Sequence, residues 1–158
     1  MMKIILVDTQ GKVTPAGSKS HIVYRFFVPN GAERLAVHFT YGPKYLEDQE
    51  KARLLIEQGI DTYFEAEYLE QAKARWQSYL PLQNLITVSV DAPDGHRGAA
   101  HRHDREQLHI LSRHEATPGL VQGEIIPGMW EVTLSLHAIV TDVCDYTLKV
   151  WLEEEGTQ

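Results

Sequence analysis

The stretch that decides the fold is MWEVTLSLHAIV, residues 129–140, in which apolar and polar side chains alternate along nearly the whole length. The apolar set comprises Trp130, Val132, Leu134, Leu136, Ala138 and Val140, and the opposite set comprises Glu131, Thr133, Ser135 and His137. A period of two places one set on each face of an extended strand. The stretch therefore predicts a long strand with one face in a hydrophobic core.

The same alternation occurs at residues 35–41, 86–91 and 146–152. The segment HIVYRFFVP, residues 21–29, is apolar on both faces near its end, which is typical of a central strand. Turn-forming pairs such as Pro118-Gly119 separate these segments, because glycine accepts a positive φ. Short strands divided by turns predict an all-β, jelly-roll-like β-sandwich of about eight strands.

One block, residues 44–80, departs from the alternation. It is rich in Glu, Gln, Ala, Lys, Arg and Leu, and it contains no proline. Gly59 is typical of the residue after a helix, and Asp61 of the residue that begins the next one. We expect a two-helix insertion at 44–80, in which Trp76 and Tyr79 cover the core.

The length and charge of the chain limit its class. A chain of 158 residues predicts a single domain, 1–158. The net charge of −7 argues against general binding to nucleic acid or to an anionic membrane, because such binding needs a basic surface. A single cysteine, Cys144, excludes an internal disulfide, and we expect it to be buried. Since the first residues carry no signal peptide and no apolar run spans a membrane, we expect a cytoplasmic protein.

Histidines gather in GHRGAAHRHDREQLHILSRH, residues 95–114, which holds five of the eight histidines and four arginines. On a strand, His101 and His103 would share one face, and Glu106 or His109 could complete a site for zinc or another divalent transition metal. The neighbouring arginines would repel such a cation, which favours a solvated loop or surface strand.

The arginines of this stretch also predict an anion site. The guanidinium groups of Arg97 and Arg102 can bind a carboxylate or a phosphate, and Gly98 would let the backbone approach a ligand closely. The alternative is structural, with Arg97 paired to Asp91 or Asp94 so that it fixes the turn.

Four segments suggest a family. They are YRFFVPNGAERLAVHFTYGP (24–43), NLITVSVDAPDGHRGAAHRH (84–103), EATPGLVQGEIIPGMWEVTLSLHAIV (115–140) and CDYTLKVWLE (144–153). Their succession, with an RG pair followed by ATPG and PG-x-W, resembles the N-terminal β-sandwich domain of carbaryl-hydrolase-type metallohydrolases of the PHP superfamily. That resemblance implies a non-catalytic domain, because the metal-dependent hydrolysis of the family belongs to a following domain. As the sequence stops at Gln158, we expect a stand-alone module, and no catalytic residue is carried over.

These observations predict a non-catalytic accessory or binding module without a cofactor, whose partner is another protein or a second copy of the chain. One alternative is a small metal-dependent hydrolase built on His101 and His103. Another is an anion-responsive sensor that uses Arg97 and Arg102.

Overall fold

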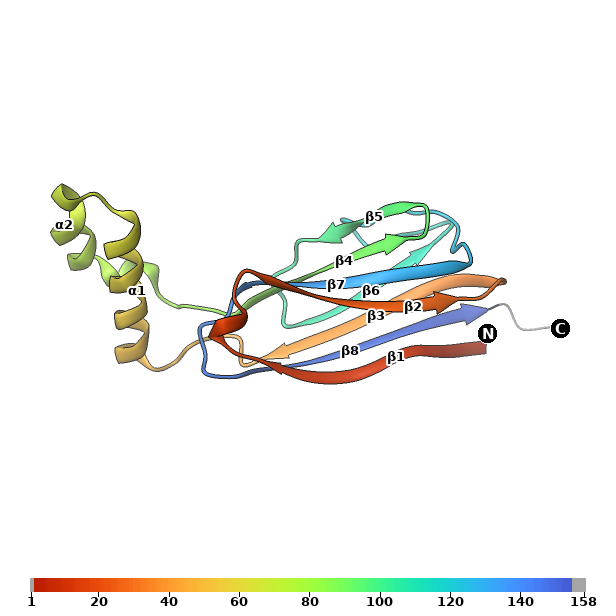
Figure 1. Cartoon of the computed structure of the whole chain (residues 1–158), viewed down its shortest axis with the longest axis horizontal. Coiled ribbons are helices and arrows are strands. Elements are labelled where there is room, and N and C mark those ends of the chain that lie inside the picture. The colour runs from red at the N-terminus through yellow and green to blue at the C-terminus, as the bar shows by residue number, and fades with distance from the viewer. Residues whose placement is uncertain (1, 155–158) are drawn as a thin grey trace.

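The predicted strand at 129–140 is β7, at the centre of one of two antiparallel sheets that pack face to face (Figure 1). A computed structural model describes residues 2–154. Its strands are β1 (Met2–Val13), β2 (Ser20–Val28), β3 (Ala32–Gly42), β4 (Leu85–Ala92), β5 (Gly95–Ala100), β6 (Glu106–Ser112), β7 (Gly128–Ala138) and β8 (Cys144–Glu154).

The order of the strands identifies a jelly roll. One sheet has the order β1-β8-β3-β6 and the other has the order β2-β7-β4-β5. The chain changes sheet at every connection between strands except the β4–β5 turn. Two four-stranded sheets wound in this manner are the jelly-roll form of the β-sandwich, so the predicted fold class is confirmed.

The core lies between the two sheets and is made of the apolar faces that the alternation predicted. Strand β7 pairs with β2 on one side and β4 on the other, which places Val132 opposite both Tyr24 and Val90. The predicted inward side chains of the four alternating segments are buried, as are Val28 and Cys144, with two exceptions at the end of 129–140. Ala138 and Val140 are only half-buried and Ile139 is buried instead, because β7 ends at Ala138 and the alternation does not continue beyond it. Burial of each large aliphatic or aromatic side chain contributes about 2 kcal/mol, so these faces account for most of the driving force for folding.

Strand β2 differs from the expectation that residues 21–29 form a central strand, because it lies at the edge of its sheet. Its Val23 and Phe27 point to solvent, and Phe27 is 60% exposed. Apolar residues on both faces indicate a central strand only where both faces of the sheet are covered, and here one face is open.

Strands β1 and β6 lack a clear alternating signal for local reasons. The pairing of β1 with β8 shifts register between Ile5 and Val7, which interrupts the period of two. In β6 two of the inward side chains are polar, Gln107 and His109.

The helical insertion is confirmed within 44–80, but its helices differ from those expected. Helix α1 (Gln49–Tyr63) begins at Asp48, whose carboxylate accepts a hydrogen bond from the Lys51 backbone N–H at 3.1 Å. It continues through Gly59, because one helical glycine costs only about 1 kcal/mol. The second helix, α2 (Leu69–Ala74), is one and a half turns long and is flanked by short 3-10 turns at Ala66–Tyr68 and Trp76–Tyr79.

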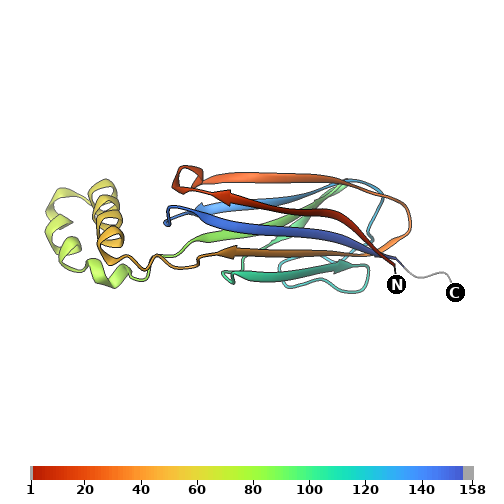
Figure 2. The same cartoon turned by 90° about the horizontal axis from the view of Figure 1, so that it is seen from below.

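These helices form an arm, residues 49–80, that projects from one end of the sandwich (Figures 1 and 2). The buried stripe of α1 consists of Ala52, Ile56 and Ile60. The arm does not cover the core, so the expectation that Trp76 and Tyr79 do so was wrong. Within residues 2–154, neither α1 nor α2 has the length and apolar character needed to cross a bilayer.

Candidate functional site

Several loops meet at the end of the sandwich from which the arm projects, here called the arm end. They are the two connections to the arm, the β5–β6 loop at residues 101–105 and the β7–β8 loop at residues 139–143. The first half of the histidine-rich stretch forms β5 and the loop, and the second half enters β6.

The predicted metal ligands are placed on different sides of the structure. His101 and His103 are exposed in the 101–105 loop, outside any strand. Glu106 faces outward from β6, where its carboxylate lies 3.2 Å from Nε2 of His38, whereas His109 faces the core and is 1% exposed. Among residues 2–154, no three His, Cys, Asp or Glu side chains are grouped so as to hold a metal ion. A metal site at these residues stays a prediction that the geometry does not support.

His109 instead supports the 101–105 loop from inside the core. The amide nitrogen of Gln107 donates a hydrogen bond to the Asp104 carbonyl at 2.7 Å, which leaves Oε1 of Gln107 facing the histidine. This oxygen can only accept, so Nε2 of His109 donates to it at 2.8 Å. The other ring nitrogen, Nδ1, is buried without a partner in the described part of the chain. Burial, with a smaller effect of Arg102, lowers the pKa of His109 to about 4, so the ring is neutral near pH 7.

Arg97, predicted to bind an anion, is held by the protein itself. Its side chain is 11% exposed and lies 5.4 Å from the centre of the Trp130 ring. Nη2 donates to the Glu124 carbonyl at 2.9 Å and lies 3.8 Å from a carboxylate oxygen of Asp94. This arrangement matches the structural alternative for Arg97, and anion binding at Arg97 and Arg102 stays a prediction.

The RG, ATPG and PG-x-W motifs meet in one place. Gly98 and Gly119 have φ angles of +114° and +99°, and their backbones approach so closely that a Cβ on either would collide with the other segment. Arg97 of the first motif stacks on Trp130 of the last. The motifs behind the family resemblance therefore have a shared packing role in this chain.

At the arm end, Lys44 is buried although it is charged at neutral pH in water. Only 8% of the residue is exposed, and Nζ donates to Oη of Tyr41 at 2.6 Å and to the Asn84 carbonyl at 2.9 Å. Burial lowers the pKa of the Lys44 ammonium, with Asp104 acting in the opposite direction. Burial also raises the pKa of Tyr41 to about 12, so its phenol stays protonated.

Asn84 joins three loops of the arm end. Its side-chain amide donates to the Pro43 carbonyl at 2.8 Å and to the Thr141 hydroxyl at 2.9 Å, and its Oδ1 accepts from the Val140 N–H at 2.7 Å. Neither Lys44 nor Asn84 was singled out from the sequence. The partners of each come from separate strands and loops, and no spacing motif signals such a set.

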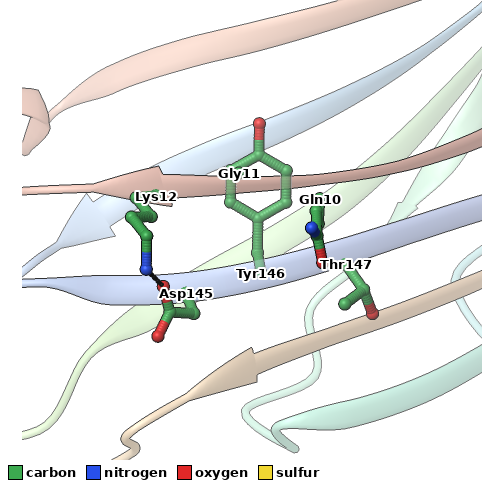
Figure 3. Close-up of a pocket in the computed structure, with 6 residues that line it drawn as sticks. All are labelled: Gln10, Gly11, Lys12, Asp145, Tyr146 and Thr147. Carbon is green, nitrogen blue, oxygen red and sulfur yellow. Dashed lines mark hydrogen bonds and ion pairs between the residues drawn. The ribbon is translucent and has the colours of Figure 1, made fainter.

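A hollow of about 390 Å³ lies where β1 pairs with β8 (Figure 3). Gly11 is the register partner of Tyr146, whose ring occupies the space that a side chain at Gly11 would need. The Tyr146 hydroxyl is 2.6 Å from that of Tyr24, and Lys12 pairs with Asp145 at 2.6 Å. Lys12, Asp145 and Tyr146 thus have partners within the protein, which favours a packing role for this hollow.

The arm carries an aromatic groove of about 330 Å³. Its walls are the side chains of Phe64, Tyr68, Gln71, Ala72, Arg75, Ser78 and Tyr79. The three aromatic residues are each exposed by two-fifths or more, and the adjacent Tyr63 is 76% exposed. Large exposed aromatic side chains in a group are typical of a surface that binds another molecule.

Comparison with known proteins does not place the chain in a family. No family model matches the sequence, and no curated protein matches it. Among solved structures, the chain is similar to a crystal structure of a Sulfurospirillum deleyianum protein, with 6% identity over 94% of this chain and 99% of that one. The TM-score is 0.34, a level that supports no statement about family or function.

Proposed function

We propose that the protein is a non-catalytic β-sandwich module that binds a protein surface through its arm, and that this surface belongs to a second copy of the chain. Such a role agrees with the resemblance to the non-catalytic sandwich domain of PHP-type metallohydrolases. The observation that carries the proposal is the aromatic groove on an arm that covers none of the core.

A two-fold contact between arms fits this surface, because each copy offers both a groove and exposed aromatic side chains. Phe64, Tyr68, Tyr79 and Tyr63 together expose roughly 400 Å² per copy, taking about 200 Å² for a whole aromatic side chain. A stable interface buries about 800 Å² per partner. The expected dimer is therefore weak and reversible.

The net charge of the chain predicts how dimer formation depends on ionic strength. Each copy has a net charge of −7, so two copies repel one another. Salt screens this repulsion and does not weaken aromatic contacts, so association is expected to strengthen as ionic strength rises.

Sedimentation velocity of the whole chain over a range of concentrations tests the proposal. The double variant Tyr68→Ser/Tyr79→Ser removes two walls of the groove. Phe27→Ser is the control, because Phe27 is an aromatic residue that is at least as exposed but lies on the outer face of a sheet, away from the arm. We expect the wild type and the control to form dimers that strengthen with salt, and the double variant to remain monomeric. A wild type that is monomeric at every concentration, or a control that dissociates like the double variant, would overturn the proposal.

A further inference from the structure

The side chain of Lys44 carries a charge that the described part of the chain does not neutralise. Lys12, Lys51 and Lys73, which are all less buried than Lys44, each lie beside an aspartate. Lys44 has no carboxylate oxygen within ion-pair distance in residues 2–154, although it is more than nine-tenths buried. A buried ammonium without a counter-charge is costly, because it has lost its hydration and gained no opposite charge.

The hydrogen bonds of Lys44 leave one donor position free. Tyr41 donates its phenol proton to the His103 carbonyl at 3.1 Å, so its oxygen accepts from Lys44. The Asn84 carbonyl is the second acceptor. Because an ammonium has three N–H groups, the third remains available to a ligand.

Two open hollows of about 330 and 380 Å³ meet at this residue. Both are lined by Lys44, Tyr45 and Arg105, and His103 also lines the smaller one. Arg105 belongs to no ion pair in the described residues, so its guanidinium is a second cation without a fixed partner.

Two acidic side chains border the same hollows, Asp104 on the first and Glu47 on the second. Both are exposed, as Arg105 is, and neither carboxylate lies within ion-pair distance of Lys44 or Arg105. Each hollow therefore has two cationic side chains, Lys44 and Arg105, and one carboxylate, so positive charge exceeds negative charge in each.

We propose that the arm end binds a small oxyanion between Nζ of Lys44 and the guanidinium of Arg105. One ligand oxygen accepts the free N–H of Lys44, and the planar guanidinium binds a second oxygen. The ligand supplies the counter-charge that Lys44 lacks. A phosphate group and a carboxylate share this chemistry, and the size of the hollows suits a small molecule.

Isothermal titration calorimetry of the whole chain with inorganic phosphate, and separately with acetate, at constant ionic strength tests this site. We expect binding to wild type, and at least a tenfold weaker affinity in Arg105→Gln, since the exposed Arg105 side chain belongs to no ion pair in the described residues and its loss should leave the fold intact. Arg113→Gln is the matched control, since Arg113 is exposed and lies at the other end of β6 from Arg105, and it is expected to bind as wild type does. Lys44→Met is expected to abolish binding, and its thermal unfolding shows whether it is folded.

The outcomes separate the possible ligand sources and sites. Tighter binding of phosphate than of acetate identifies a phosphate ligand, and the reverse order identifies a carboxylate. Absence of binding to either ion would overturn the proposal, as would unchanged affinity in Arg105→Gln. Loss of binding in Arg102→Gln with full binding in Arg105→Gln would overturn it in favour of the arginines predicted from the sequence. These results do not depend on dimer formation, because the arm groove and the hollows share no lining residue.

Discussion

Acid is expected to destabilise this protein through His109. The ring is buried in the core, where Nε2 donates to Gln107 and Nδ1 has no partner in the described residues. Protonation would add both a positive charge and an unpaired N–H to the core. Burial, assisted by Arg102, therefore holds the pKa of His109 at about 4, below the value of 6.5 in an unfolded chain.

The sign and size of the effect follow from proton binding. Between pH 6.5 and 4 the unfolded chain binds a proton at this residue and the folded chain does not, so the free energy of unfolding decreases as pH falls. At 1.36 kcal/mol for each pKa unit, the loss across this interval is about 3 kcal/mol. That is a large part of the stability of an ordinary domain.

Urea unfolding followed by tryptophan fluorescence, at several pH values from neutral to the pKa of His109, measures this loss. We expect His109→Gln to lose about 3 kcal/mol less than wild type over the interval, since glutamine cannot be protonated. The control His101→Gln changes an exposed loop histidine and is expected to follow wild type. If His109→Gln and wild type lose stability in parallel, acid acts elsewhere and the role given to His109 is wrong.

Three further substitutions test the packing described above, each by its change in the free energy of unfolding. Asn84→Ala removes the hydrogen bonds that join three loops and is expected to cost about 3 kcal/mol, whereas Asn30→Ala, in an exposed turn, is expected to cost little. Gly11→Val would place a side chain against the Tyr146 ring, where even a Cβ would lie 2.5 Å from the nearest ring atom, and is expected to cost about 2 kcal/mol. Combining Gly11→Val with Tyr146→Ala should then cost less than the sum of the single changes, and additive costs would contradict the clash. Arg97→Met is expected to cost about 2 kcal/mol, because it removes the hydrogen bond and the ion pair that Arg97 forms near Trp130. A variant as stable as wild type would show that Arg97 has no structural role and would favour its predicted role in anion binding.

The sequence predicted those parts of the fold where local pattern and final environment agree. Trp130, Val132 and Leu134 alternate with the polar residues Glu131 and Thr133 and lie inside, because this part of β7 has one face in the core and the other outside it. The alternation of apolar and polar residues did not predict β6, because the inward-facing Gln107 and His109 are polar. They can lie inside because they form a hydrogen bond with each other. Helical periodicity located the insertion in the sequence. It did not predict that the helices project away from the sandwich, because that direction depends on contacts at the arm end.

Local sequence pattern predicted the candidate sites less well than it predicted the fold. Histidine density in 95–114 suggested a metal site, yet the parity of a strand separates Glu106 from His109. The Lys44 site combines residues from three separate parts of the chain, and it was recognised because Lys44 is buried, which its residue type alone does not reveal. Neither burial nor the meeting of distant loops can be deduced from composition.

The position of the last two strands has a consequence for how the chain folds during synthesis. Strand β7 lies between β2 and β4, and β8 lies between β1 and β3, so the last two strands of residues 2–154 are internal to the two sheets. Until they are made, β1 and β2 have no neighbour in their sheets, and only the β3–β6 and β4–β5 pairs can form. The nascent chain is therefore expected to expose apolar faces, and to need protection from aggregation, until both β7 and β8 have been made.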